Sequence, residues 1–285
     1  MNAAQAILER LGRTVVLLAL VAVGTIALMR LAPGYFSDAR EMDARYAQSA
    51  RSELSAERSA QASVWSTGTH ALGGWLHGDM GQSRQYEMPV SQLLGPRLRV
   101  TASLLAHGIV YGWLLAFCTA LPVSTMRRGG AMFGMPFTLL LAIPTGAMAT
   151  VCLLTNLGGP VLVLTLLLAA RDFKFLERVL HGAWTSPHVL QARAQGLRMD
   201  QMLRGHVLPN VLPNLLALAT LSLITALSAI VPVEVIFDVP GVGQLAWSAA
   251  MNRDLPVLLA VTLMMATAVA FAGLVSHPAR TLETA

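Results

Sequence analysis

The chain has 285 residues, of which 55% are hydrophobic and only 12% are charged. Soluble globular domains carry about 25% charged residues, so this composition excludes an ordinary soluble domain and indicates a polytopic membrane protein. The formal net charge is +5, and nineteen of the twenty basic residues are arginines. The arginines stand mostly in loops beside apolar runs, where membrane topology explains them better than nucleic-acid binding does.

The first apolar run, Thr14–Met29, follows Arg10 and Arg13. A secretory signal peptide begins in the same way. Here, however, no small-x-small cleavage site follows directly, because the run ends in Met29-Arg30-Leu31-Ala32-Pro33. We therefore expect an uncleaved first span with its N-terminus in the cytoplasm.

Six apolar runs predict an all-α, polytopic membrane bundle of about six transmembrane helices in one transmembrane domain, 1–285. The expected spans are 8–31, 99–125, 131–155, 157–178, 211–237 and 255–275. A bilayer requires about 20 apolar residues in a helix. The fourth run, Leu157–Ala170, has only 14. Its helix should therefore continue through Arg171–Leu180, with Arg171 and Lys174 reaching the interface.

Several expected spans contain residues that disturb helices. They are Pro122, Pro136, Pro144 with Gly146, and Pro232. Membrane helices tolerate such residues where neighbouring helices or water satisfy the freed backbone groups. Together these residues suit a protein that has to move.

The expected orientation follows from the distribution of charge. The segment 171–210 carries six basic residues against three acids, whereas 34–95 carries seven acids against five arginines. Because basic residues accumulate on the cytoplasmic side, the first segment should be cytoplasmic and the second, within 32–98, periplasmic. In the periplasmic region we expect a solvated helix over Ser37–Ser63 and a short amphipathic helix over Pro89–Leu98.

A polar, arginine-bearing segment separates the fourth and fifth apolar runs and has its own helix signals. Ser186 is placed to cap a helix by accepting a backbone N–H, and Pro187 suits the first helical position. Gly196 can adopt the left-handed conformation that ends a helix, which leaves about nine helical residues, or roughly 13 Å. Asp200 is placed to cap a second short helix that ends at Leu208-Pro209. Two short capped helices in a basic loop indicate a docking element.

Sequence signatures of catalysis are missing from the chain. It contains no H-E-x-x-H, no G-x-S-x-G, no P-loop and no pair of carboxylates inside apolar runs. We therefore predict no catalytic residue, no metal site and no cofactor, and any P-loop ATP hydrolysis would be done by another chain. Cys118 and Cys152 are expected to be small buried hydrophobic residues, and His107 an interior hydrogen-bonded residue.

Glu234 is the one acid that we expect at an apolar run, close to the outer end of the fifth span. Two interpretations stay open: an ionisable functional residue at membrane depth, or an interface residue in contact with water. The residues that follow contain Pro240-Gly241 at turn positions. We expect a re-entrant or lid-like periplasmic scoop over 238–254, with Asn252-Arg253-Asp254 marking the return to the membrane.

Four places in the chain together resemble one family, the inner-membrane permease subunits of binding-protein-dependent ABC importers of the dipeptide/oligopeptide/nickel group. The places are Leu31-Ala-Pro-Gly34; Gly78-Asp-Met-Gly-Gln-Ser83 with Pro89-Val90 and Arg127-Arg128-Gly129; Gln191-Ala-Arg-Ala-Gln-Gly-Leu197 with His206-Val-Leu-Pro-Asn210; and Val233–Gly243 with Asn252-Arg-Asp254 and Pro256. The third place resembles the family's EAA loop in sequence and in glycine-to-proline spacing. The four motifs occur in the family's order over nearly the whole chain.

The resemblance implies a mechanism and a set of partners. The first helix of the cytoplasmic loop, within 185–210, would be a coupling helix that inserts into a cleft on a cytoplasmic ATPase. The implied partners are a second homologous permease subunit, two cytoplasmic ABC ATPase subunits, a periplasmic substrate-binding protein and membrane lipid, without nucleic acid. The implied location is the bacterial inner membrane, and the implied substrates are peptides or a related small solute such as a nickel complex.

The resemblance also implies two groups of site residues. The ATPase-coupling residues would be Pro187, Leu190, Ala192, Arg193, Ala194, Gly196, Leu197, Arg198, Leu208 and Pro209. The candidates for the translocation pathway or its gate are Glu234, Asp238, Pro240, Gly241 and Gly243.

The sequence departs from the family at the first of these groups. Leu190 stands where the signature loop carries a glutamate, which excludes a salt bridge from that position to the ATPase. Coupling should therefore depend on shape and on Arg193 and Arg198, with the small side chains of Ala192 and Ala194 allowing close approach.

Two other classes of function stand beside the permease hypothesis. An ion-coupled secondary transporter that uses Glu234 is the alternative, although it would need no docking helix and such folds usually show internal repeats, which this sequence lacks. A membrane enzyme is a third hypothesis, weakened by the missing catalytic residues. The short connection Asn156–Pro160 leaves the outer mouth and the type of substrate open.

Overall fold

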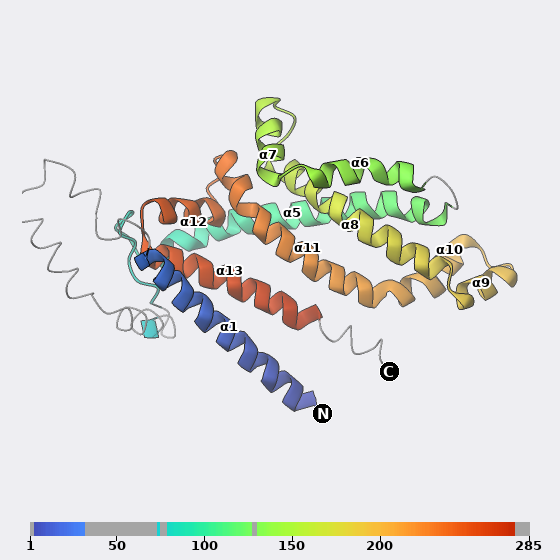
Figure 1. Cartoon of the computed structure of the whole chain (residues 1–285), viewed down its shortest axis with the longest axis horizontal. Coiled ribbons are helices and arrows are strands. Elements are labelled where there is room, and N and C mark those ends of the chain that lie inside the picture. Colours follow the sequence, from blue (N-terminus) through green and yellow to red (C-terminus); the bar gives the residue numbers. More distant parts are fainter. Residues whose placement is uncertain (1–2, 32–72, 75–78, 127–129, 277–285) are drawn as a thin grey trace, which may run out of the picture. The chain divides into compact units, whose positions relative to one another are not determined.

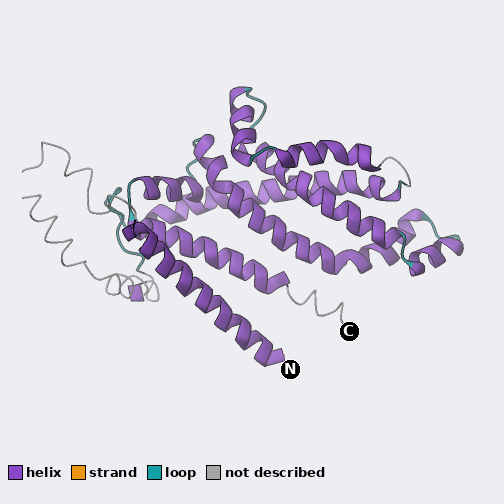
Figure 2. Ribbon diagram, in the orientation of Figure 1, coloured by secondary structure: helices purple, strands orange, loops and turns teal. Residues whose placement is uncertain are grey.

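The computed structural model describes residues 3–31, 73–74, 79–126 and 130–276, and these residues form helices joined by short turns (Figure 2). One isolated β-bridge joins Gln82 and Pro89. The predicted all-α class is thus confirmed. The expected helix over Ser37–Ser63 and the basic pair Arg127-Arg128 lie outside the described residues.

The helices in chain order are named in Figure 1. They are α1 (Ala3–Leu31), α5 (Val90–Thr125), α6 (Gly130–Ala142), α7 (Thr145–Leu154), α8 (Pro160–Trp184), α9 (Pro187–Ala194), α10 (Met199–Met202), the π-helical turn η1 (Leu203–Val207), α11 (Leu208–Ile236), α12 (Val242–Met251) and α13 (Leu255–Ser276). The chain divides into two compact units, residues 1–98 with 245–268 and residues 99–244 with 269–285.

Three described helices are long and apolar enough to cross a membrane: Val90–Thr125, Met199–Ile236 and Leu255–Gly273. A bent helix pair raises the number to four if it is counted as one span. The first of the three is one continuous helix of 36 residues. The helix expected over Pro89–Leu98 is therefore present from Val90 and is continuous with the second span, because it runs through Pro96 without a break.

The expected third span, 131–155, is not one helix. Its two halves, α6 and α7, meet at an angle of 93°. Pro144 stands at the junction with φ −58° and ψ 140°, and it has no N–H to donate to the preceding turn. Its ring also disfavours helical backbone at Ile143. The proline that looked tolerable inside an apolar run thus divides it.

The helix of the fourth expected span, α8, has 25 residues and continues through Arg171–Leu180 as predicted. Pro160 stands at its start, where a missing N–H leaves no acceptor unsatisfied. One face of α8 is buried along its whole length. Its fully buried apolar side chains include Leu164, Leu168, Leu176 and Leu180. The charged side chains Arg171, Lys174, Glu177 and Arg178 are partly or fully exposed.

Small residues bring α5 close to α8 within the second unit. Gly108 and Gly112 are so near α8 that an added Cβ would stand 2.8 Å from Leu164 Cβ and 2.9 Å from Leu168 Cβ. Small residues at every fourth position let helix backbones approach in a membrane. The same face of α5 continues with Ala116.

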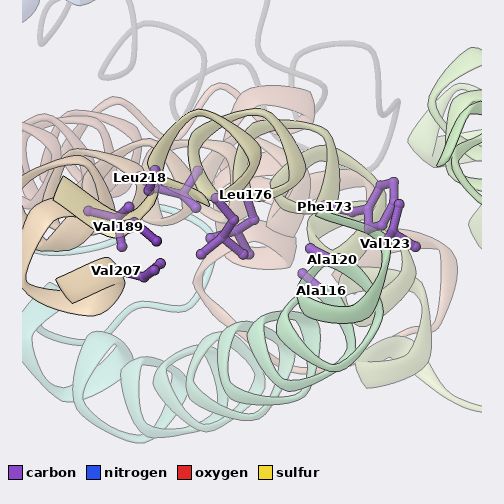
Figure 3. Close-up of a cluster of buried hydrophobic side chains, with 11 residues drawn as sticks. Ala116, Ala120, Val123, Phe173, Leu176, Val189, Val207 and Leu218 are labelled. Carbon is purple, nitrogen blue, oxygen red and sulfur yellow. The ribbon is translucent and has the colours of Figure 1, made fainter. Parts of the chain in front are cut away.

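This packing leads into an apolar core at the α9 end of the second unit (Figure 3). The core joins α5, α8, α9, η1 and α11, and its buried side chains are Ala116, Ala120, Val123, Phe173, Leu176, Leu180, Ala183, Val189, Val207, Val211 and Leu218. The short helix α9 is therefore attached to the bundle through shared apolar burial.

In the first unit, α1 packs against α13 through a small cluster, Ala22 and Ile26 on one helix with Leu259 and Leu263 on the other. The hydroxyl oxygens of Thr25 and Thr262 lie 3.5 Å apart beside it. The first predicted helix, 8–31, is thus confirmed as a helix with one buried face.

Candidate functional site

The coupling-helix candidate α9 begins where its sequence predicts. Ser186 is the N-cap residue, with φ −69° and ψ 147°, and Pro187 is the first helical residue. The predicted capping bond is wrong, since the Ser186 hydroxyl instead donates to the Ala183 carbonyl at 2.6 Å. This bond ties the start of α9 to the last turn of α8.

The end of α9 is set by Gly196, whose φ of +82° confirms the predicted left-handed turn. The Gly196 N–H donates to the Arg193 carbonyl at 3.0 Å, and the Leu197 N–H donates to the Ala192 carbonyl at 3.3 Å. These two bonds form a Schellman motif, which satisfies the last carbonyls of the helix. The eight residues of α9 are thus closed at their C-terminal end by the backbone itself.

The two faces of α9 differ sharply in exposure. Val189 and Ala192 are only 2% and 3% exposed and face the chain's own core. Leu190 is 50% exposed, and Arg193 and Ala194 are exposed with it. The expectation that Ala192 allows close approach to a partner is therefore corrected, because Ala192 packs inward. Ala194 lies on the open face.

The second short helix differs from its prediction. Arg198, and not Asp200, is the N-cap residue of α10, and its N–H donates to the Gln201 side-chain oxygen at 3.0 Å. Asp200 lies in the first turn, where its charge suits the helix dipole, 3.7 Å from the Arg198 guanidinium. Both of these side chains are exposed, so this ion pair contributes little to stability.

The helix that starts with α10 also does not end at Leu208-Pro209. It passes through the π-helical turn η1 directly into α11. Pro209 has no N–H to donate four residues back, and the Leu208 N–H donates instead to the Leu203 carbonyl, five residues back. The wider turn accommodates the proline, so loop and span form one helix from Met199 to Ile236.

A pocket of about 400 Å³ opens beside α9. It is lined by Ser124, Thr125, Met126, His181, Trp184, Thr185, Val189, Leu190, Arg193, Met199 and Met202. The buried indole N–H of Trp184 has no acceptor among the described residues. The pocket is thus a mainly apolar hollow with Arg193 among its lining residues.

Glu234 lies at the other end of α11 and is fully buried. Its carboxylate accepts the Thr101 hydroxyl at 2.6 Å, the Gly243 N–H at 2.7 Å and the Gln244 N–H at 3.2 Å. The two N–H groups belong to the first turn of α12, where a carboxylate is favoured by the helix dipole. The interpretation of Glu234 as an interface residue in contact with water is therefore wrong.

The neighbouring glycines are required by this carboxylate. A Cβ at Gly241 would overlap the Glu234 carboxylate, and a Cβ at Gly243 would stand 2.8 Å from Val231 Cα. Two other gate candidates, Asp238 and Pro240, are exposed. Asp238 has φ +51° and accepts the Gln244 side-chain amide at 2.6 Å.

In the first unit, two of the family-like motifs meet at a buried carboxylate. Asp254 is 1% exposed. It accepts the Ser83 hydroxyl at 2.5 Å and the Gln85 N–H at 3.1 Å. The segment that ends in Ser83 and the segment that ends in Asp254 are 171 residues apart. Their sequence signals are thus explained by one shared hydrogen-bonded cluster.

A third buried carboxylate is Asp172 of α8, which the charge pattern had grouped with the cytoplasmic loop and not with any site. It is fully buried, with Oδ2 2.8 Å from the Ser222 hydroxyl of α11. The Trp113 indole of α5 donates to the same hydroxyl at 3.2 Å. Helical spacing was the available signal, because Asp172 stands four residues from both Leu168 and Leu176 on the buried face of α8.

Comparison with known proteins identifies similar chains. A putative peptide permease protein of Brucella ovis is 27% identical over 229 residues, which cover 70% of this chain and 72% of that protein. The dipeptide transport system permease protein DppB of Lactococcus lactis subsp. cremoris is 24% identical over 281 residues, 91% of each chain. The nickel import system permease protein NikB of Staphylococcus aureus is 24% identical over 280 residues, 89% of this chain and 83% of that protein.

A family match carries the assignment further. Residues 108–279, which include α8, the loop from α9 to η1, α11 and the Glu234 turn, match the family described as the binding-protein-dependent transport system inner membrane component. The matched stretch is more than half of the chain. It supports a permease and gives no support to the ion-coupled alternative. The chain therefore belongs to the inner-membrane permease components of binding-protein-dependent importers.

Proposed function

We propose that the chain forms half of the translocation pathway of an ATP-driven importer in a bacterial inner membrane. A second homologous permease would supply the other half, two ABC ATPases the energy, and a periplasmic binding protein the substrate. Peptides or a related small solute, such as a nickel complex, are the proposed substrates. Support for this class comes from the names of the similar permeases, which specify peptides, a dipeptide and nickel.

The observation that carries the coupling role is the two-faced structure of α9. On its inner face, Val189 is buried with the ends of α8 and α11 in one apolar core, and Ala192 is buried as well. Its outer face presents Leu190 beside exposed Arg193 and Ala194. A force on the outer face is therefore passed to two long helices, since a close-packed core transmits displacement and deforms little.

The chemistry of α9 also indicates what its partner surface should contain. The helix has no acidic residue, and Arg193 and Arg198 both stand on the exposed side of the loop. We propose that the ATPase cleft is apolar where it meets Leu190 and acidic at its rim. Charge attraction of this kind acts mainly on the rate and orientation of docking.

The gate candidates keep different proposed roles. Glu234, Gly241 and Gly243 are engaged in one buried turn, which supports a role in holding that turn together. Asp238 and Pro240 are exposed and are the members of this group that can meet a substrate or the binding protein.

The proposal is tested by reconstituting the chain in vesicles with its second permease, ATPases and binding protein, and measuring uptake of labelled dialanine and of radioactive nickel. Uptake of one of these probes should require ATP inside the ATPase-bearing compartment and the binding protein on the other side. Uptake driven by a pH gradient without ATP would contradict the proposal. Vesicles that contain ATPases without this chain are the control.

A further inference from the structure

The buried carboxylate Asp172 has an unusual hydrogen-bond environment. Its Oδ1 atom is buried and has no partner among the described residues. Its Oδ2 atom lies 2.8 Å from Ser222 Oγ, and the same hydroxyl oxygen lies 2.9 Å from the Leu218 carbonyl oxygen. The Trp113 indole N–H points at Ser222 Oγ from 3.2 Å. Three helices therefore converge on one hydroxyl group.

Counting protons decides how this cluster is arranged. A serine hydroxyl has one proton and can accept two more hydrogen bonds. If Asp172 were a carboxylate, Asp172 and the Leu218 carbonyl would have to share the single Ser222 proton in a three-centre hydrogen bond, which is weaker than two separate bonds. If Asp172 carries a proton, Asp172 and Trp113 both donate to Ser222, and Ser222 donates to Leu218. Three contacts are then matched by three protons.

The surroundings agree with the neutral form. No described basic residue forms an ion pair with Asp172. Its neighbour Arg171 directs its guanidinium to the Leu221 carbonyl at 2.9 Å, and Lys174 reaches toward α6, where a Cβ at Gly134 would stand 2.9 Å from its Nζ. Burial therefore disfavours a carboxylate that has one donor and no ion pair, and the neighbouring Arg171 charge offsets only part of this cost.

Other titratable groups lie on the elements that pack against α8. Those on the described parts are Arg97, Arg99, His107, Tyr111 and Cys118 of α5, Cys152 of α7, His188 and Arg193 of α9, Arg204 and His206 of η1, and Glu234 of α11. None of these side chains has a hydrogen bond to Asp172. The helices α6 and α7 contain no charged residue.

We propose that Asp172 is kept as the neutral acid and acts as a positioning residue, donating to Ser222 so that α8 and α11 are locked together. These two helices enter and leave the coupling loop (Figure 1). The lock makes them respond as one body when α9 is displaced. This inference rests on the proposed function, because it concerns how movement of the coupling loop reaches the membrane helices.

The test compares Asp172→Asn, Asp172→Leu and Ser222→Ala in the complete reconstituted importer. An asparagine amide is neutral and can donate to Ser222 as the acid does, so uptake of the transported probe per ATP hydrolysed should stay within about twofold of the parent. Leucine fills the space without a hydrogen bond, and Ser222→Ala removes the acceptor. Each should lower uptake per ATP by about tenfold, a coupling loss of ordinary size.

Ser228→Ala is the matched control, because the Ser228 hydroxyl is exposed and donates only to Ile224 of its own helix. It should leave uptake per ATP unchanged. Should Asp172→Leu fail to assemble, the smaller change Ser222→Ala still tests the lock. An Asp172→Asn complex as impaired as Asp172→Leu would overturn the neutral acid, and full coupling in both Asp172→Leu and Ser222→Ala would overturn the positioning role.

A spectroscopic readout separates this inference from the proposed function. The infrared spectrum of the parent minus that of Asp172→Asn should contain the carbonyl stretch of a protonated carboxyl group at about pH 5, above the ordinary aspartate range. A carboxylate band in its place would overturn the inference, even in a complex that transports. A parent complex without ATP-driven uptake would instead count against the proposed function and leave the infrared result valid.

Discussion

The two ends of the fifth long helix, α11, are held in opposite ways. At the η1 end, α9 is held mainly by apolar burial, with Val189, Val207 and Val211 in a common core, beside the Ser186–Ala183 hydrogen bond and a backbone motif at Gly196. At the other end, the buried Glu234 carboxylate gathers three donors from α5 and α12. The η1 end exposes a face of α9 to which a partner can bind, whereas the polar groups at the Glu234 end form hydrogen bonds with one another inside the chain.

Because of this difference, substitutions at the two ends of α11 should have different effects. Apolar contacts are non-directional, so the attachment of α9 depends on close packing more than on the geometry of any one bond. A buried carboxylate with several donors fixes one geometry, because removal of any partner leaves a desolvated polar group. We therefore expect substitutions at the Glu234 end to reduce stability, and substitutions on the outer face of α9 to reduce coupling at nearly constant stability.

The largest loss of stability is expected from Gly241→Ala. The added Cβ overlaps the Glu234 carboxylate and has to displace it from all of its donors. The unfolding free energy should fall by about 4 kcal/mol or more, measured as thermal unfolding of the purified protein in detergent. Gly182→Ala is the control, since nothing stands within 4 Å of its added Cβ. Equal stability of the two variants would contradict the structure of the turn.

Glu234→Ala comes next, because it leaves the Thr101 hydroxyl and two backbone N–H groups without the carboxylate. We expect a loss of about 3 kcal/mol in unfolding free energy, with a smaller loss for Glu234→Gln, whose amide oxygen can still accept. Molecules that remain folded should keep the parent ratio of uptake to ATP hydrolysed. A normal melting temperature together with lost uptake would instead assign Glu234 to the translocation pathway.

Val189→Ala tests the apolar core at the η1 end of α11. The removed methyl groups leave space inside the core that joins α9 to α8 and α11, and the unfolding free energy should fall by about 2 kcal/mol. Because α9 is then held more loosely, uptake per ATP should fall as well. Purified complexes that unfold earlier but remain fully coupled would show that the apolar attachment of α9 is not what transmits its movement.

Local chemistry explains which of these features were accessible from sequence. Pro187 and Gly196 act through their own backbone preferences, so the start and the end of α9 could be predicted. The N-cap residue of α10 could not be predicted, because the choice between Arg198 and Asp200 depends on the direction of the chain after Gly196. The break at Pro144 was underestimated, since an apolar run reads as continuous whether or not its helix bends.

The buried carboxylates show a second limit. Glu234 can be singled out in the sequence because it is an isolated acid beside an apolar run. Its hydrogen-bond donors, however, come from Thr101 and from residues 243–244, which are brought together only by folding. Asp172 stands among charged residues in the sequence, and its burial follows from the packing of α8 against α11. The spacing of residues along a helix can be read from one sequence, but the helix face that packs against them cannot.

Gly196→Val tests the backbone at the end of α9. Nothing stands within 4 Å of an added Cβ at Gly196, so the change acts through its φ of +82° alone. A left-handed backbone with a β-branched side chain should cost about 2 kcal/mol and displace the turn, which lowers uptake per ATP. Gly205→Val is the matched control, because Gly205 also has an open surrounding but no positive φ. Unchanged uptake in Gly196→Val would show that the turn does not position α9.

Leu190→Ala should have the smallest effect on stability and a clear effect on coupling. Leu190 is 50% exposed, so its truncation should change the unfolding free energy by no more than about 0.5 kcal/mol. In the assembled importer this side chain would be covered by the ATPase, and losing an apolar anchor at an interface typically weakens binding by about 1–2 kcal/mol. ATPase retention on the immobilised permease should therefore fall about tenfold while the melting temperature stays constant.

Val189→Ala should act in the opposite way, with a lower melting temperature and a weaker effect on ATPase binding. If Leu190→Ala lowers stability and leaves ATPase retention intact, the outer face of α9 is not the surface that meets the ATPase.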